Sequence, residues 1–167
     1  PTSPRGTGVD RAGAGRAAAE DPALAPKPAE PSVVAAQAAV RAALPFGNRE
    51  DFEDAQRGFI ATVPDALIAS AAGHRVWSLK EYAFLEGDAA PPTINPSLWR
   101  QAQLNLHHGL FRVVDGVYQV RGFDIANMTL IEGDTGVIVI DPLTAAELSR
   151  AGLELYFQHR PRRPVVA

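Results

Sequence analysis

The four histidines are the first candidates for chemistry, because imidazole is a common zinc ligand. His107 and His108 are adjacent, so on a helix their side chains would point about 100° apart and could not chelate one ion. His74 stands alone in a predicted loop, and His159 ends a predicted helix, where the helix dipole by itself favours a cation. No pair has the i, i+2 or i, i+4 spacing of a metal site. We therefore expect no metal ligand among these histidines.

Asp141 and Asn127 are the other polar residues at positions where a site could form. Asp141 follows the apolar run at residues 137–140, which is typical of a strand buried on both faces. The carboxyl end of a buried strand is where α/β proteins usually gather functional side chains. The alternative is that Asp141-Pro142 only ends the strand and begins a turn. Asn127, taken by itself, is a turn residue at the start of the preceding strand.

Composition excludes several function classes. The net charge is −3 and arginines are scattered among carboxylates, so there is no basic stripe for nucleic acid. No window approaches the roughly 20 apolar residues of a membrane span. The chain has no cysteine and hence no thiolate ligand or disulfide, which leaves a cytoplasmic or a periplasmic location open. Glycine-rich phosphate loops and the G-x-S-x-G elbow of serine hydrolases are absent too.

The first part of the chain divides into two predicted segments. Residues 1–43 are rich in alanine and proline and lack aromatic residues, which predicts disorder. Residues 44–109 form a predicted helical extension. Its first helix is capped by Asn48 and carries an apolar stripe that includes Phe59 and Ile60. Its second helix, over residues 95–108, has Asn95 as cap and Pro at the next position.

From residue 110 the apolar period changes from 3.6 to 2. Residues 110–114 and 117–120 flank Asp115-Gly116, which predicts a tight hairpin. Residues 128–132 and 137–140 form a second predicted pair. The motif Thr144-Ala-Ala-Glu predicts a capping box that opens the next helix, and residues 163–167 begin a new strand. The fold class is therefore α+β. With its partner strands missing, the chain is expected to be poorly stable, with residues 137–140 as an unpaired edge.

Several segments together resemble the alkyl sulfatases, a family within the metallo-β-lactamase superfamily. The strongest is DIANMTLIEGDTGVIVIDP at residues 124–142, and the others are DFEDAQRGFIA at 51–61, Val76-Trp77 and NPSLWRQAQLN at 95–105. The resemblance implies that residues 44–109 are an N-terminal extension and dimerisation arm, in which Trp77 would contact a second subunit. It also implies that residues 110–167 are the opening strands and first helix of a metallo-β-lactamase-type αββα sandwich, incomplete in this chain.

The same resemblance implies a function. The parent protein would be a homodimeric alkyl sulfatase that uses two zinc ions to hydrolyse sulfate esters such as dodecyl sulfate. Asp141 would lie beside the metal loop and support its ligands, and Asn127 would border the cleft. The zinc loop H-x-H-x-D-H and the sulfate-binding basic residues would follow residue 167, so we expect the chain by itself to bind no zinc and to be inactive. The alternative is a non-catalytic fragment or interaction module.

Overall fold

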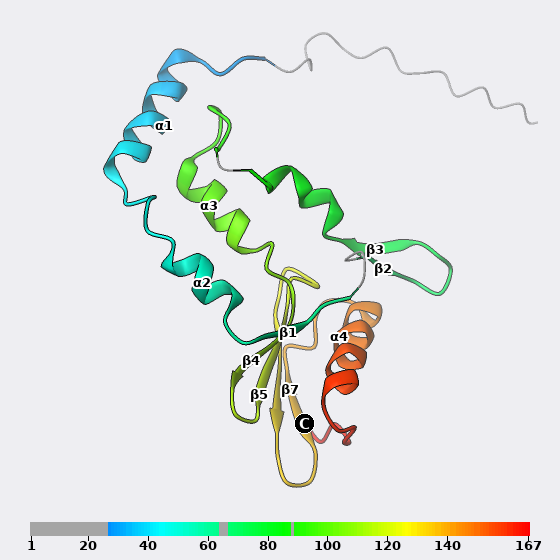
Figure 1. The fold of residues 1–167 in the computed structure, drawn as a ribbon. Helices are drawn as coiled ribbons and strands as arrows, with labels where there is room; N and C mark the ends of the chain where they lie inside the picture. Colours follow the sequence, from blue (N-terminus) through cyan, green and yellow to red (C-terminus); the bar gives the residue numbers. More distant parts are fainter. Residues whose placement is uncertain (1–26, 64–66, 88) are drawn as a thin grey trace, which may run out of the picture.

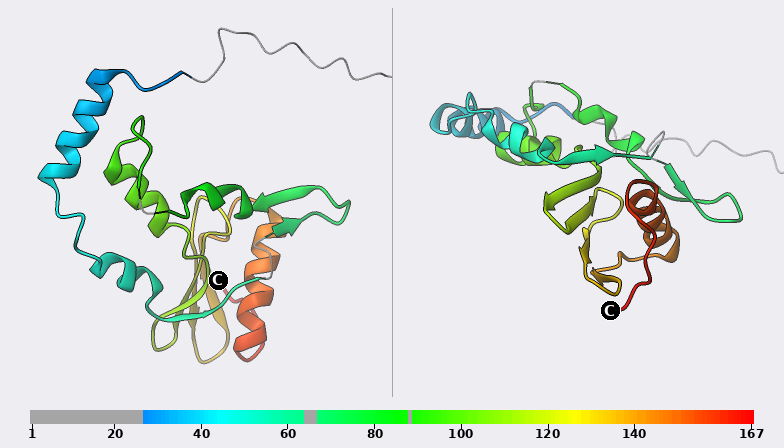
Figure 2. Two further views of the ribbon diagram at one scale, coloured as in Figure 1. Left: turned by 45° about the horizontal axis from the view of Figure 1, so that its top comes forward. Right: turned by 60° about the horizontal axis from the view of Figure 1, so that its bottom comes forward.

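The computed structural model describes residues 27–63, 67–87 and 89–167. Helices and an antiparallel sheet alternate along the chain, which confirms the predicted α+β class (Figure 1). The right-hand view of Figure 2 separates a layer of α1, α2, α3 and the β2–β3 hairpin from the sheet and α4. No helix within the described residues is long and apolar enough to cross a membrane.

The alanine-rich segment is helical where it is described. Residues 1–26 of the predicted disordered segment lie outside the described residues. For the rest the prediction is wrong, because Pro31–Ala43 forms helix α1. Alanine has the highest helix propensity, and Pro31 stands at the first helical positions, where its missing N–H is not needed. None of the α1 residues is fully buried, but α1 contacts α3 and its Val33 and Val40 are half-buried, so helix propensity and this limited packing together account for the helix.

Helix α2, Glu50–Gln56, is shorter than the sequence predicts. Asn48 Oδ1 accepts a hydrogen bond of 2.8 Å from Glu50 N, as expected of a capping residue. The helix then stops because Gly58 adopts a φ of +75° and lies so close to Arg112 that a Cβ would sit 2.1 Å from its carbonyl oxygen. The assignment of Phe59 and Ile60 to an apolar helix stripe is wrong: Phe59–Ala61 is strand β1 and pairs with β4.

The next elements cover one end of the sheet. Strands β2, Leu67–Ala69, and β3, Arg75–Ser78, form a separate hairpin, followed by the 3₁₀-helix η3, Lys80–Leu85. Helix α3, Pro96–Leu104, has the predicted cap, since Asn95 Oδ1 accepts hydrogen bonds from Ser97 N and Leu98 N. The helix ends at Leu104, four residues earlier than predicted, and leaves His107 and His108 in the connection to β4.

Within the described residues, five strands form the main sheet, in the order β1-β4-β5-β6-β7. Strands β4, Gly109–Val114, and β5, Val117–Arg121, form the predicted hairpin, with Gly116 at a φ of +77° in its turn. Strands β6, Met128–Glu132, and β7, Val137–Ile140, form the predicted second pair. Helix α4, Ala146–His159, packs its buried face on the sheet. The core joins apolar side chains from both, among them Leu110, Val120, Met128, Leu130, Leu155 and Tyr156.

Strand β7 differs from the prediction on both its faces and its edge. Ile138 and Ile140 are 39% and 52% exposed, so the strand is buried on one face only. Its edge is not unpaired, because residues 164–167 run parallel to it. Val137 N donates to Pro164 O at 2.8 Å, and Val139 N donates to Ala167 O at 2.7 Å. In place of the predicted final strand, residues 164–167 form a single parallel bridge at Val165, and their backbone covers the edge that we expected to be open.

Strand β1 belongs to the predicted extension, residues 44–109, yet it pairs with β4, most of which lies in the predicted next domain. The division of the chain at residues 43 and 109 stays a prediction.

Two arginines join elements that are distant in the sequence. Arg100 of α3 donates from Nε to Asp51 Oδ2 of α2 at 2.8 Å and from Nη1 to Phe46 O at 3.1 Å. Arg160, just after α4, binds both carboxylate oxygens of Glu132 on β6 at 2.8 Å. The buried Tyr156 hydroxyl donates to the same carboxylate at 2.8 Å, and burial raises the pKa of this hydroxyl above its ordinary value. The hydrogen bonds from Arg160, then those from Tyr156, hold the pKa of Glu132 below its usual range although burial opposes this.

We predict that Glu132→Gln lowers the free energy of unfolding by about 1–3 kcal/mol, since it removes the charged acceptor of two donors. Glu132 has a lowered pKa, so its contribution is present above the ordinary glutamate range and is lost as pH falls through the lowered value. The gap between the wild type and the variant should therefore narrow in acid. Urea unfolding at several pH values measures this, with Glu154→Gln on the exposed side of α4 as the control. Equal stability of the two variants at neutral pH would contradict the prediction.

Candidate functional site

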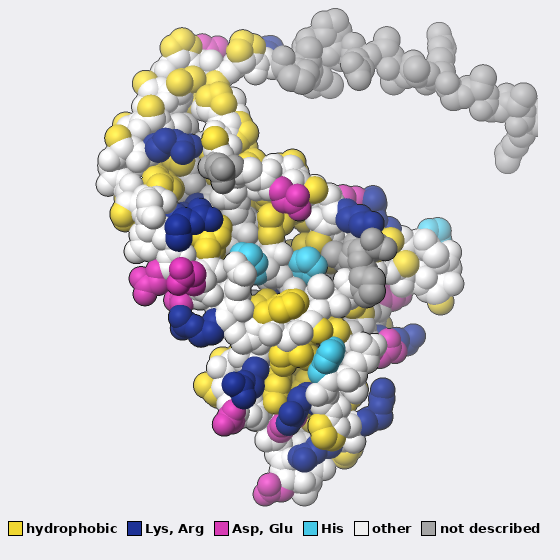
Figure 3. Space-filling view, viewed as in Figure 1, with side chains coloured by type: hydrophobic (Ala, Val, Ile, Leu, Met, Phe, Trp, Pro, Cys, Tyr) yellow, Lys and Arg dark blue, Asp and Glu magenta, His cyan; other side chains and the backbone are white. Residues whose placement is uncertain are grey.

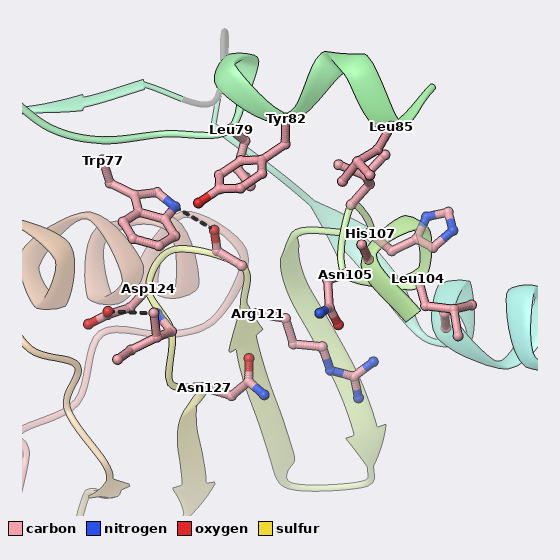
Figure 4. Close-up of a pocket in the computed structure, with 15 residues that line it drawn as sticks. Trp77, Leu79, Tyr82, Leu85, Leu104, Asn105, His107, Arg121, Asp124 and Asn127 are labelled. Carbon is pink, nitrogen blue, oxygen red and sulfur yellow. Dashed lines mark hydrogen bonds between the residues drawn. The ribbon is translucent and has the colours of Figure 1, made fainter. Parts of the chain in front are cut away.

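Several strand ends and connections meet at one end of the main sheet. Gly109 pairs with Arg121, Val120 with Met128, and Thr129 with Ile140, so the segments 107–109, 121–128 and 140–144 are neighbours. A pocket of about 510 Å³ opens at this end, beneath β3 and η3 (Figure 4). This places it between the sheet and the helical layer.

The pocket has apolar and polar parts. Figure 4 shows Leu79, Tyr82 and Leu85 reaching down from the β3–η3 side, and Arg121 and Asn127 on the sheet side. The apolar lining is Ala55, Trp77, Leu79, Tyr82, Leu85, Ala102, Leu104, Leu106 and Ile125, and the polar lining is Asn105, His107, Arg121, Asp124 and Asn127. The lining comes from segments between residues 55 and 127 of the chain.

Asp124 is the most constrained polar residue of the site. It is 8% exposed, and its Oδ1 accepts from Ile125 N at 2.7 Å while its Oδ2 accepts from Thr144 Oγ1 at 2.6 Å and from Thr144 N. Burial by itself would raise its pKa, but the hydrogen bonds from Thr144 and Ile125 outweigh this and hold the pKa below its ordinary value. Asp124 thus connects the loop before β6 with the segment before α4.

This contact corrects the predicted capping box. Thr144 does not cap α4, whose N-cap is Ala145 without a side-chain hydrogen bond, because its hydroxyl is bound to Asp124. Sequence reasoning missed Asp124, since the partner that explains its burial lies 20 residues away. The only local signal was a carboxylate beside the buried Phe123.

Trp77 and Gly122 join the hairpin layer to the sheet. Trp77 Nε1 donates to Gly122 O at 2.9 Å, so this indole is bonded within its own chain. Its contact with a second subunit stays a prediction. Gly122 has a φ of +73°, and a Cβ there would lie 2.6 Å from the Cβ of His108. Only glycine permits this approach, which fixes the connection that carries His107 next to the pocket.

Arg121 projects a cation into the pocket lining. Its Nε donates to Gln119 Oε1 at 2.7 Å, and its guanidinium lies 4.5 Å from the centre of the Phe111 ring. Burial lowers the pKa of this guanidinium, although arginine stays protonated at neutral pH. Within the described residues, no carboxylate forms an ion pair with it.

The two residues singled out from the sequence lie at the same end of the sheet. Asn127 is exposed and lines the pocket. Asp141 is exposed, adopts a φ of +55° and does not line the pocket. Among the described residues no hydrogen bond or ion pair involves the Asp141 side chain. Aspartate tolerates the left-handed region better than most residues, as a strand-ending turn requires. The role of Asp141 beside a metal loop stays a prediction.

The histidines are separated in space by the fold. Only His107 lines the pocket, and burial, followed by the charge of His108, lowers its pKa and favours the neutral imidazole. His108 Nδ1 lies 2.8 Å from Leu106 O, His74 lies between β2 and β3, and His159 ends α4. Within the described residues no three histidine, aspartate or glutamate side chains gather as a metal site would require. These residues do not by themselves fit a zinc centre.

Charged side chains of both signs are interspersed over the face shown in Figure 3. The pocket, rather than a charged surface, is therefore the candidate ligand site at this end of the molecule.

No model of a protein family matches the chain. Three relatives do. The chain is 51% identical over 139 residues to the alkyl/aryl-sulfatase BDS1 of Saccharomyces cerevisiae, and 54% identical over 141 residues to an (R)-specific secondary-alkylsulfatase of Pseudomonas sp.. It is 48% identical over 142 residues to a linear primary-alkylsulfatase of Pseudomonas sp.. These matches cover 83–84% of the chain but only 21–22% of the relatives, so the chain spans about a fifth of their length.

The solved structure of the stereoselective inverting sec-alkylsulfatase Pisa1 from Pseudomonas sp. gives the same result. It matches with a TM-score of 0.77 and 54% sequence identity, over 84% of this chain and 22% of that one. The resemblance indicated by the sequence is therefore confirmed: over most of its length, this chain is homologous to one segment of the alkyl sulfatases.

Proposed function

We propose that the chain is part of a zinc-dependent alkyl sulfatase that hydrolyses sulfate esters such as dodecyl sulfate. The observation that carries the proposal is the identity of 48–54% to three alkyl sulfatases that differ in the esters they are named for. Two zinc ions in the parent protein would activate the attacking water. Because the described residues contain no metal cluster, the zinc ligands would come from elsewhere in the parent protein.

The finer fold assignment is also part of this proposal. We assign residues 110–167 to the first sheet and first helix of a metallo-β-lactamase-type αββα sandwich. The antiparallel strands β4 to β7, followed by α4 and a parallel return at Val165, support it. In such a sandwich a second sheet would cover further apolar surface, and the exposed Ile138 and Ile140 of β7 are suitable residues for it to cover.

Within this proposal the chain contributes positioning rather than a catalytic group. Asp124 fixes the loop that carries Asn127 to the segment that follows Asp141. Asp141 would support the metal ligands and Asn127 would border the cleft. Residues 44–109 would form the arm of a homodimer, to which the exposed Phe84 and Leu98 would contribute apolar surface.

Activity and zinc content of the full-length protein test the proposal. We expect the purified full-length protein to release sulfate from dodecyl sulfate, to contain about two zinc ions per subunit, and to lose activity on chelation and regain it with zinc. The 167-residue chain should release none under the same conditions. A full-length protein that folds and binds zinc but leaves dodecyl and secondary alkyl sulfates intact would refute the assignment.

Asp141→Asn in the full-length protein tests the role of this carboxylate. If Asp141 supports a metal ligand, zinc affinity or turnover should fall about 10- to 100-fold, because a lost carboxylate partner typically has that effect. Asp134→Asn, in the exposed turn between β6 and β7, is the matched control. Bound zinc and sulfate release are measured on the same preparations. Normal zinc content and turnover in Asp141→Asn would reduce Asp141 to a turn residue.

A further inference from the structure

The Arg121 guanidinium has fewer partners than a half-buried cation needs. Its Nε donates to Gln119 Oε1 at 2.7 Å, and the group lies 4.5 Å from the centre of the Phe111 ring. Among the described residues its Nη groups donate no hydrogen bond, and no carboxylate forms an ion pair with it. The Nη donors are therefore available to a further partner.

The polar neighbours of Arg121 leave its charge uncompensated. Asn105 and Asn127 line the same pocket and carry neutral amides (Figure 4). Burial lowers the pKa of His107, which therefore adds no charge at neutral pH. The carboxylate of Asp124 also lines the pocket, but its oxygens accept hydrogen bonds within its own loop and from the segment before α4. Within the described part of the lining, Arg121 is thus a cation without a paired anion.

The position of Arg121 becomes unfavourable if the remaining water is removed from it. Burial already lowers the pKa of its guanidinium, because desolvation opposes the charged form. A segment that covers this end of the sheet would exclude more water, and a covered guanidinium without an anion is strongly destabilising. A carboxylate is the protein group that best prevents this, since its two oxygens match the parallel N–H groups of the guanidinium.

Two observations indicate that such a segment exists in the full-length protein. The chain spans about a fifth of the length of the relatives it matches, so most of such a protein lies outside this segment. Ile125 lines the pocket together with Arg121 and is 87% exposed, although Phe123, two residues earlier, is 1% exposed. Covering Ile125 would remove apolar surface from water. The covering segment should therefore bring an apolar surface as well as a carboxylate.

A segment of the same polypeptide is favoured over a free anion or a second molecule. Linkage to the chain gives such a segment a high effective concentration at this surface, so it competes well with partners that must arrive from solution.

We infer that Arg121 forms an ion pair with a carboxylate from outside residues 1–167 of the same full-length subunit, in a segment that also covers Ile125. Arg121 is then a docking residue that fixes this end of the sheet against the rest of the subunit. The inference rests on the proposed function only in that the chain is part of a longer protein. It requires neither zinc nor hydrolysis of a sulfate ester.

A crystal structure of the full-length protein, grown without substrate, tests the inference directly. We expect an Arg121 Nη group within about 3.2 Å of a carboxylate oxygen from outside residues 1–167, with Ile125 covered by the same segment. The inference is overturned if the Nη groups face solvent or a free anion. A carboxylate partner from within residues 1–167, or from a second subunit, would overturn it as well.

Thermal unfolding of full-length variants gives an independent measurement. Arg121→Gln should lower the unfolding midpoint by about 3–8 °C, because it leaves a covered carboxylate unpaired. Arg150→Gln removes the same charge from the exposed side of α4 and should change the midpoint by less than about 1 °C. Equal losses in the two variants would contradict the ion pair.

A double variant separates an ion pair from the packing of Arg121 on Phe111. Once the crystal structure has identified the acid that pairs with Arg121, that acid is replaced by its amide in the Arg121→Gln background. The double variant should be at least as stable as Arg121→Gln alone, because the second change removes the unpaired charge. Additive losses would refute the pair. None of these measurements uses a substrate, so a full-length protein that has the pair but releases no sulfate would contradict the proposed function alone.

Discussion

The buried carboxylate of Asp124 is the interaction on which the arrangement of the pocket depends. A carboxylate that is 8% exposed would be unfavourable without partners, and here both oxygens accept hydrogen bonds. Its donors are Ile125 N in its own loop and the backbone and hydroxyl of Thr144. One side chain therefore fixes the loop that carries Asn127 and the path of the chain from Asp141 to α4. Without it, two connections at the end of the sheet would lose their common anchor.

The opposite wall of the pocket depends on a second contact of the same loop. The Trp77 indole donates to Gly122 O and holds the β2–β3 hairpin against the sheet. Gly122 also allows His108 to approach more closely than any larger residue would. Residues 121–125 consequently support both sides of the pocket. This explains how a cation from β5 and apolar side chains from β3 and η3 come to line the same space.

The sequence predicts the elements whose signals are local. Asp115-Gly116 in the β4–β5 turn and Asn95 as the cap of α3 are confirmed, because a turn or a cap is decided by the residue itself and its immediate neighbours. The prediction that the helix continues through Phe59 and Ile60 is wrong, because a short apolar run fits both the 3.6-residue period of a helix and the two-residue period of a strand. Because Gly58 lies close against the backbone of Arg112, the residues that follow it pair with β4 as a strand.

The site was less predictable because its contacts are tertiary. The motif at Thr144 predicts a capping box, but the Thr144 hydroxyl donates to Asp124, which lies in a loop 20 residues earlier. Arg121 and Trp77 carry no motif, and only the pairing of β4 with β5 and the placement of β3 bring them to one pocket. Asp141 and Asn127 were selected as strand ends, and the structure does place both at the same end of the sheet, since Thr129 pairs with Ile140.

Amide hydrogen exchange in the full-length protein and its Asp124→Asn variant is the most direct test of this account. The account predicts faster exchange in the variant at Ile125 and Thr144, whose amides donate to the carboxylate, while β4 and β5 exchange as before. Equal exchange at both amides in the two proteins would contradict it.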